Sequence, residues 1–196
     1  MTSRNRTHTD RWLSADAYNR GWAERSEQLV NMFIEAEYEE EKPYTVAEYG
    51  CGANAPVEKA CAAYSNFSVS KFDITKWDEQ TTVQDLNNAN IELQKCDVSV
   101  FSGVLEYLND VPSVIATAMD SSEYLLLSYA FLPAASKQAD KSYINHLKRR
   151  VKHGWRNHYS LDELTSLLSK TGVISNVGIW KNTQALFLVR NFSIDL

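Results

Sequence analysis

Residues 48–54 read Glu48-Tyr49-Gly50-Cys51-Gly52-Ala53-Asn54, and a short apolar run that starts at Tyr44 leads into them. Two glycines separated by one residue let a backbone turn tightly and let a ligand approach it closely. Asn54 tolerates a left-handed conformation better than most residues, and Pro56 suits the first turn of a helix. The stretch therefore predicts a strand, a ligand-binding loop and a helix in direct succession.

The chain around this loop alternates short apolar segments with helical ones. Apolar runs bounded by turn residues predict strands over 44–49, 67–72, 82–86, 98–102, 124–130, 173–180 and 185–189. Helical spacing predicts helices over 10–37, with Gly21 as a candidate break, and over 56–64, 111–119, 137–151 and 160–170. Such alternation is typical of an α/β fold, and we expect a doubly wound, Rossmann-like, mostly parallel seven-stranded sheet.

The two edges of this sheet are expected to differ from its centre. The last two predicted strands are joined by a tight turn around 181–183, so one edge strand should be antiparallel. The connections after the second and third predicted strands are too short for full helices, so the sheet should be trimmed on one side. Before the last predicted helix, Ser160 and Glu163 have the spacing of a capping box.

Size and composition restrict the class of protein. A chain of 196 residues fits one globular unit, which we divide into an N-terminal helical cap (1–42) and a main domain (43–196). No apolar run is long enough for a membrane span, and residues 1–10 lack the apolar stretch of a secretion signal. Cys51, Cys61 and Cys96 form no C-x-x-C pair, so we expect a reducing cytoplasm, no disulfide framework and no metal site. The net charge of −5 disfavours a general nucleic-acid binder.

Two classes of ligand fit the glycine loop when it is taken alone. Residues 50–55 also match the G-x-G-x-x-G/A pattern of dinucleotide-binding proteins, with Asp73 at nearly the right distance for a ribose contact. Glu48 separates the two classes, because a carboxylate there can face a ligand ammonium but would sit poorly beside a pyrophosphate. The chain also lacks the length for a dehydrogenase's substrate domain. A plain glycine turn with an exposed Glu48 is a third interpretation.

The segment 44–54 resembles the first motif of class I S-adenosylmethionine-dependent methyltransferases, in which an acid and a Gly-x-Gly-x-Gly run follow an apolar strand. Asn54 replaces the third glycine of that motif. The resemblance extends over about 44–190 and implies that the chain binds S-adenosylmethionine. It further implies that Asp73 grips the two ribose hydroxyls, a role that suits a carboxylate because it can accept two hydrogen bonds. A helix or turn cap is the alternative role for Asp73.

A second match at the right spacing strengthens this resemblance. Residues 97–107 resemble the family's fourth-strand motif, common in small-molecule methyltransferases, which passes beneath the methyl donor; Tyr107 stands where many members have histidine. The resemblance also implies that Asp85 faces the adenine amino group, with Asp78 and Asn87 as competitors for that position. The cofactor site that we predict comprises Glu48, Tyr49, Gly50, Gly52, Asn54, Asp73, Ile74, Asp85, Leu86, Ser102 and Gly103.

The chemistry of methyl transfer points to a second group of residues. Attack by an alcohol needs a general base within hydrogen-bond reach, and histidine suits that task near neutral pH. Residues 152–159 precede the last predicted helix, which should begin at the ligand-binding face, so we favour His158 as the base and place His153 second. A surface loop whose histidines only cap or pack is an equally good interpretation. The predicted acceptor contacts are Tyr107, Tyr129, Arg150, Trp155, Arg156 and Tyr159, of which the first two could equally be core tyrosines.

The acceptor itself is less sharply defined by the sequence. Basic residues cluster over 137–156 and favour an anionic acceptor such as a phosphate- or carboxylate-bearing sugar, although a solvated helix face is the alternative. Residues 154–159 look like methyltransferases found with bacterial polysaccharide enzymes. We therefore expect a small-molecule or saccharide O-methyltransferase. Trp12, Tyr18 and Trp22 could form a lid, but we prefer that they anchor an N-terminal helix to the sheet.

Three competing functions stay open. An RNA or protein methyltransferase could dock through the basic segment, although no Asn- or Asp-Pro-Pro-Tyr segment occurs, which counts against the amino-directed nucleic-acid type. A non-catalytic protein could bind the methyl donor or its demethylated product without turnover. A nicotinamide-dependent enzyme would use the same glycine loop for a dinucleotide.

Overall fold

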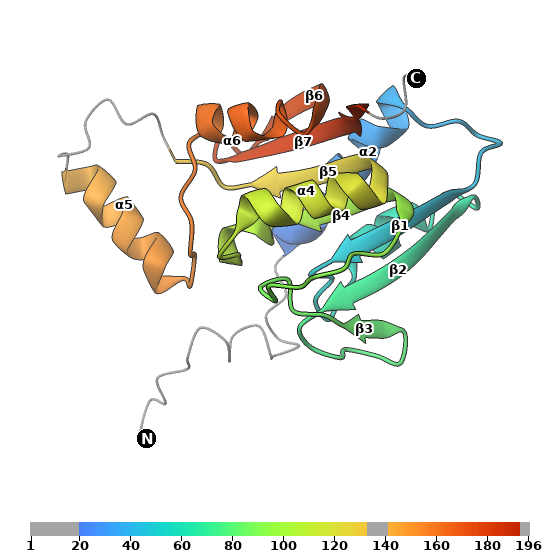
Figure 1. The fold of residues 1–196 in the computed structure, drawn as a ribbon, viewed down its shortest axis with the longest axis horizontal. Helices are drawn as coiled ribbons and strands as arrows, with labels where there is room; N and C mark the ends of the chain where they lie inside the picture. The colour runs from blue at the N-terminus through green and yellow to red at the C-terminus, as the bar shows by residue number, and fades with distance from the viewer. Residues whose placement is uncertain (1–19, 133–140, 193–196) are drawn as a thin grey trace.

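The structure is a computed structural model that describes residues 20–132 and 141–192. Seven strands form one sheet in the order β3-β2-β1-β4-β5-β7-β6 (Figure 1). The strands are β1 (Tyr44–Tyr49), β2 (Phe67–Asp73), β3 (Thr81–Val83), β4 (Cys96–Ser102), β5 (Ser122–Tyr129), β6 (Gly172–Trp180) and β7 (Gln184–Asn191). Every strand expected from the sequence is present, with bounds that differ by a few residues.

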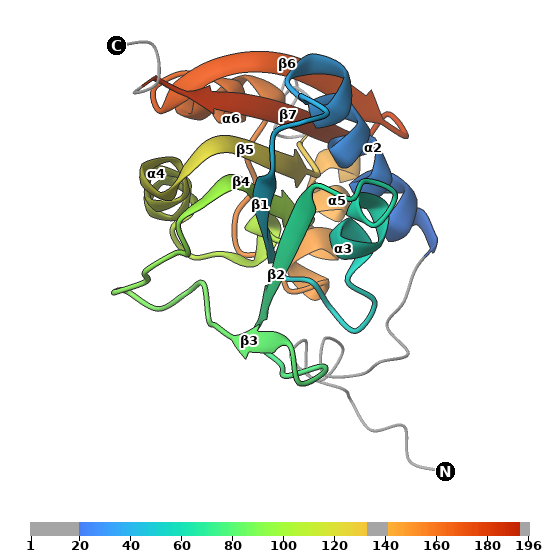
Figure 2. The same cartoon turned by 90° about the vertical axis from the view of Figure 1, so that its right-hand side faces the viewer.

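Strand direction places one set of strand ends together. The pairs that join β3, β2, β1, β4 and β5 are parallel, whereas β7 pairs antiparallel with both β5 and the edge strand β6 (Figure 2). The predicted α/β, mostly parallel sheet with an antiparallel edge strand is thus confirmed. In register, Tyr49 of β1 lies between Phe72 of β2 and Phe101 of β4, so these three strands end at the same edge.

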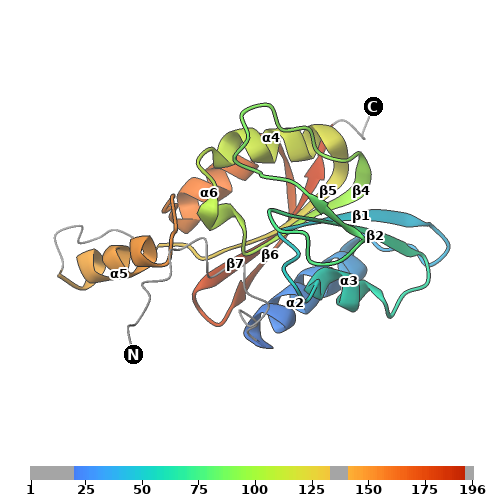
Figure 3. The same ribbon diagram turned by 90° about the horizontal axis from the view of Figure 1, so that it is seen from below.

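Helices cover both faces of the sheet (Figure 3). One face carries α2 (Arg20–Ala36) and α3 (Pro56–Cys61), and the other carries α4 (Val111–Ser121) and α6 (Leu161–Leu168). Successive side chains of a strand point to opposite faces, so Tyr124 and Leu126 of β5 join the core under α2, while Leu125 and Leu127 join the core under α4. Burial on both faces explains why this strand is an uninterrupted apolar run.

Helix α2 belongs to the same core as the strands. It begins at Arg20, so Gly21 is its second residue. The residues before Arg20 lie outside the described part of the chain, and the break at Gly21 stays a prediction. Leu29 and Phe33 are buried against the sheet. Residues 10–19 of the predicted helix, with Trp12 and Tyr18, lie outside the described residues, and the division at residue 42 stays a prediction.

The sheet is trimmed beside β3, as the short connections predict. Residues 74–80 and 84–95 form turns and extended segments instead of helices, and Val83 at this edge is 60% exposed. Within the described part of the chain, no helix is long and apolar enough to cross a membrane.

The last helices border the edge where the parallel strands end. Helix α5 (Lys141–Lys152) lies beside that edge, apart from the sheet (Figure 1). Helix α6 begins with the predicted capping box, because Ser160 Oγ accepts from Glu163 N at 3.2 Å and Glu163 Oε2 accepts from Ser160 N at 2.8 Å. A short 3-10 helix that the sequence did not reveal, η2 (Leu105–Tyr107), follows β4.

Candidate active site

A cavity of about 700 Å³ opens at the carboxyl ends of β1, β2 and β4. Its size is that of a small-molecule site, and it lies where open α/β sheets bind ligands. The loops after these strands, the loop after β3 and the segment after α5 line it. The predicted site residues that line it are Tyr49, Gly50, Gly52, Asn54, Asp73, Ile74, Asp85, Leu86, Ser102, Gly103, Tyr107, His153, Trp155 and Arg156.

The glycine loop is held in a conformation that needs glycine. Gly50 has φ +72°, and a Cβ there would overlap the side chain of Val104. The backbone N–H groups of Gly50 and Cys51 donate to the carbonyl of Phe72 at 2.7 and 3.2 Å, which ties the loop to β2. Gly52 has φ +59°, and no neighbouring atom lies within 4 Å of the place that a Cβ would take, so its Cα side is open. A ligand can therefore approach the backbone closely at this point.

The start of α3 corrects two expectations. Ala55, not Asn54, takes the left-handed conformation, with φ 38°. The Glu48 carboxylate does not line the cavity; its two oxygens accept from the backbone N–H groups of Val57 and Glu58, each at 3.0 Å. Because the side chain of Glu48 is turned toward the helix N-terminus, it caps α3 and does not face a ligand ammonium. Burial raises the pKa of Glu48 to about 8.

Asp73 supports the loop from the end of β2. Its Oδ2 accepts from Gly52 N at 2.8 Å, and its Oδ1 accepts from Thr75 N at 3.0 Å. Each carboxylate oxygen can accept a second hydrogen bond, so Asp73 can cap its turn and still bind a hydroxyl in the cavity. Ile74 lies beside it and is 46% exposed.

The segment after β3 contributes Asp85 and Leu86 to the cavity. Asp85 Oδ1 accepts from Asn87 N at 2.9 Å, which shapes the turn. The competing acid Asp78 does not line the cavity, because it is paired with Lys71 Nζ at 2.6 Å. That pairing lowers the pKa of Asp78 to about 2.

Arg25 of α2 closes the cavity beside β4. Its guanidinium donates to Ser102 Oγ at 3.2 Å, to the Ser102 carbonyl at 2.9 Å and to Gln184 Oε1 at 3.0 Å. A Cβ on Gly103, which has φ +69°, would overlap this guanidinium. Gly103 is therefore needed for the arginine to approach the β4 end, and a buried cation lies at the cavity wall.

Another part of the cavity wall is aromatic and basic. Trp155 Nε1 donates to Tyr107 Oη at 3.0 Å, and the Arg150 guanidinium lies 4.7 Å from the centre of the Trp155 ring. Arg156 is exposed and donates from Nη1 to Asn109 Oδ1 at 2.7 Å. An aromatic surface beside an accessible guanidinium can bind a planar or anionic group.

A family model described as a methyltransferase domain matches residues 11–173. The chain belongs to the methyltransferase domain family. No curated protein matches the chain.

Solved structures share the fold of this methyltransferase. They include an O-methyltransferase family protein from Burkholderia thailandensis (TM-score 0.67), an O-methyltransferase family 2 protein from Planctomyces limnophilus in complex with apigenin (0.64) and magnesium protoporphyrin IX methyltransferase from Synechocystis with bound SAH (0.64), each 15% identical. These matches cover 94%, 94% and 95% of this chain and 63%, 62% and 95% of those chains. The chain thus spans less than two thirds of the first two. The likeness confirms the predicted class I methyltransferase fold.

The histidine that we favoured as the base, His158, lies outside the cavity lining, and the second candidate, His153, lies within it. His153, at the end of α5, lines the cavity and is exposed, whereas His158 does not line it. The reason lies in Asn157, whose Nδ2 donates to the carbonyls of Leu105 and Leu108 at 2.7 and 2.9 Å. Because that amide is directed at η2, the next side chain leaves the cavity. Burial lowers the pKa of His158.

Three other predicted acceptor contacts lie outside the cavity lining. Tyr129 is fully buried; its hydroxyl donates to Asn157 Oδ1 at 2.6 Å and accepts from Tyr159 N at 2.9 Å. The Tyr159 ring packs edge-on against that of Tyr129. The Arg150 guanidinium is buried and donates to the carbonyls of Ala130 and Phe131 at 2.8 and 2.5 Å. These groups position the segment after α5 and do not face an acceptor.

Several cavity residues escaped the sequence argument. Arg25 and Glu106 line the cavity without having been predicted as site residues, and Asn87, weighed as a competitor of Asp85, lines it together with Asp85. Glu106 stood inside the quoted fourth-strand motif, and its place beside Tyr107 was the available signal. Arg25 had none, because its partner Ser102 lies 77 positions away in sequence.

Proposed function

We propose that this methyltransferase uses S-adenosylmethionine as the methyl donor and methylates an oxygen of a small acceptor held in the same cavity. The observation that carries the proposal is the meeting of the glycine loop, Asp73 and the segment after β4 around one cavity of small-molecule size. The SAH in one solved structure of the same fold and the apigenin in another support this proposal.

The donor side of the cavity fits S-adenosylmethionine, which supplies an electrophilic methyl group when it is bound. Asp73 keeps acceptor capacity for two ribose hydroxyls, and the open side of Gly52 allows a close approach. Asp85 and Leu86 line the cavity and would hold the adenine. Arg25 would pair with the carboxylate of the donor, because a guanidinium binds carboxylates strongly.

The acceptor side favours a molecule that carries a negative charge. Arg156 is the exposed cavity cation, and Trp155 and Tyr107 offer an aromatic surface next to it. His153 would contact the acceptor at the rim. We propose an aromatic or saccharide acid as the acceptor; the resemblance of residues 154–159 to enzymes found with polysaccharide genes favours the saccharide. We also propose a cytoplasmic location, since Cys51 is buried and unpaired in the loop itself.

Transfer of a radiolabelled methyl group tests the proposal. Caffeate and glucuronate carry a hydroxyl and a carboxylate, and their ethyl and methyl esters are matched neutral probes. We expect labelled ether from the acids, with a KM for the esters at least tenfold higher. Arg156→Gln should abolish the difference between acid and ester, whereas Lys148→Gln, on the exposed part of α5, should keep it. Equal KM values for acid and ester would contradict an anionic acceptor.

A second function is favoured by one feature of α5. Its last turn holds Arg149, Arg150 and Lys152, of which the first and last are exposed. Exposed cations on a helix beside the cavity could dock RNA through phosphates. Labelling of RNA that weakens steeply with added salt would establish this alternative. Binding of SAH without turnover of any acceptor would instead favour a non-catalytic protein.

A further inference from the structure

Glu106 is a buried carboxylate at the cavity with one oxygen left without a protein partner. It is 3% exposed and lines the cavity from η2. Its Oε1 accepts from Ala130 N at 2.8 Å. Its Oε2 is buried and has no hydrogen-bond partner among the described residues. Buried carboxylate oxygens are rarely left in this state, because the desolvation of an unpaired charge is costly.

Two buried arginines flank Glu106 without using that oxygen. The hydrogen bonds of Arg25 go to Ser102 and Gln184, and those of Arg150 go to the carbonyls of Ala130 and Phe131. Neither forms an ion pair with Glu106 within the described part of the chain. Burial raises the pKa of Glu106, while the charges of both arginines oppose that rise. Oε2 thus lies beside two buried cations and has no partner among the described residues.

The backbone around Glu106 is fixed from the acceptor side. Arg156 N donates to the Glu106 carbonyl at 2.8 Å, and Asn157 Nδ2 donates to the carbonyls of Leu105 and Leu108. On the donor side, Gly103 packs directly against Arg25. A carboxylate held between these two walls is pre-organised, which is the condition for a group that acts on a reacting atom.

We propose that Glu106 Oε2 accepts the hydrogen of the acceptor hydroxyl and takes its proton during methyl transfer. This inference rests on the proposed function and assigns the base to Glu106, in place of either histidine. The proton passes from the acceptor oxygen to Oε2, and the acceptor oxygen forms the bond to the methyl carbon. The electron pair of the broken sulfur–carbon bond stays on sulfur. The acceptor is therefore a neutral hydroxyl at its reacting end.

Sinefungin provides a test that needs no acceptor, because it carries an amine where the transferable methyl group of the donor would be. An ammonium facing Glu106 forms a charge-assisted interaction that SAH cannot make. In calorimetry at neutral pH we expect the wild type to bind sinefungin about tenfold more tightly than SAH. Glu106→Gln should keep the affinity for SAH and lose this preference. Glu92→Gln, a matched change at an exposed glutamate, should keep both.

The outcomes separate the two proposals. Equal affinities of the wild type for sinefungin and SAH would overturn the role of Glu106. This comparison uses the wild type alone, so it tests the proposal even if the Gln variant does not fold. A preference that survives in Glu106→Gln would overturn it as well. Failure of the wild type to bind SAH would contradict the proposed function instead. In the caffeate and glucuronate assays, Glu106→Gln should lower kcat at least a hundredfold and leave the KM for the donor unchanged.

Discussion

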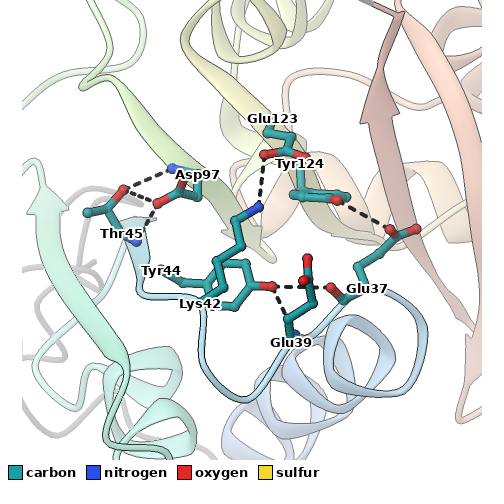
Figure 4. Close-up of polar contacts among 8 residues, drawn as sticks. All are labelled: Glu37, Glu39, Lys42, Tyr44, Thr45, Asp97, Glu123 and Tyr124. Atoms are coloured by element: carbon teal, nitrogen blue, oxygen red, sulfur yellow. Dashed lines mark hydrogen bonds and ion pairs between the residues drawn. The ribbon is translucent and has the colours of Figure 1, made fainter. Parts of the chain in front are cut away.

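The two ends of the parallel strands carry similar polar residues but use them differently. At the amino ends, the polar groups drawn in Figure 4 pair with one another. Asp97 Oδ2 accepts from Thr45 N and Oγ1 at 2.7 and 2.6 Å, and Tyr124 Oη donates to Glu37 Oε2 at 3.2 Å. At the carboxyl ends, Glu106 lines the cavity, and its Oε2 is buried without a hydrogen-bond partner among the described residues.

This difference indicates that the polar residues at the amino ends stabilise the fold, whereas those at the carboxyl ends bind a ligand. Hydrogen bonds satisfied within the protein contribute to the folded state whether or not a ligand is present. Polar atoms left unsatisfied in a cavity cost free energy until a ligand supplies the missing partner. Substitutions at the amino ends should therefore change stability alone, and substitutions at the carboxyl ends should change ligand affinity.

The largest expected effect comes from Asp73→Ala at the carboxyl ends. The change removes the acceptor for Gly52 N and the predicted ribose contact together. We expect SAH to bind about a hundredfold more weakly by calorimetry, since each bond to a carboxylate contributes about 1.5–3 kcal/mol. An affinity within threefold of the wild type would show that the loop and ribose do not depend on Asp73.

The matched change at the amino ends is Asp97→Ala. It removes the acceptor for two hydrogen bonds to Thr45. We expect urea unfolding to show a loss of about 2 kcal/mol in the free energy of unfolding, with the affinity for SAH unchanged. Weaker binding of SAH to the folded variant would erase the distinction between the two ends.

Glu48→Gln sharpens the comparison, because Glu48 lies near the cavity but behaves as a structural group. Its pKa is raised by burial to about 8 in the folded protein, above the usual 4.5 of the unfolded chain. The folded state thus holds a proton that the unfolded chain releases, so the stability from this group is full below pH 4.5 and is lost as the pH rises through 8. Gln cannot lose a proton, and its NH2 group cannot accept from one of the helix N–H groups.

Chemical unfolding at several pH values checks this prediction. We expect the variant to be less stable than the wild type by about 1 kcal/mol below pH 4.5. This gap should shrink and then reverse as the pH rises from 4.5 to 8, because only the wild type loses stability over that range. The affinity for SAH at neutral pH should change less than threefold. A stability difference that is constant with pH would contradict the raised pKa of Glu48. A large loss of SAH affinity would show that Glu48 contacts the ligand.

The smallest expected effect comes from Tyr124→Phe at the amino ends. The change removes the hydrogen bond to Glu37 and keeps the ring contact with Phe33. We expect thermal unfolding to show a loss of about 0.5 kcal/mol and no change in SAH affinity. A loss as large as that of Asp97→Ala would mean that the network acts cooperatively.

The sequence predicts the strands and the donor loop well because both depend on local pattern. The β1 strand, the glycines after it and the capping box at Ser160 are each encoded within a few neighbouring residues. Asp73 and Asp85 reach the cavity because strand ends and their loops are shared by the whole fold class.

The remaining site residues depend on contacts that sequence spacing does not express. His153 and His158 are close in sequence, yet only His153 reaches the cavity, because Asn157 is bound to η2. Glu48 has the expected identity, but the N-terminus of α3 takes up its carboxylate. Arg25 enters from a distant helix, and its approach depends on the absence of a side chain at Gly103.

Calorimetry of the wild-type protein with SAH and with NAD tests the central claim most directly. If the cavity at the carboxyl ends is a methyl-donor site, SAH binds at one site per chain and NAD neither binds nor displaces it. Binding of NAD in place of SAH would contradict this account and make the glycine loop a dinucleotide site.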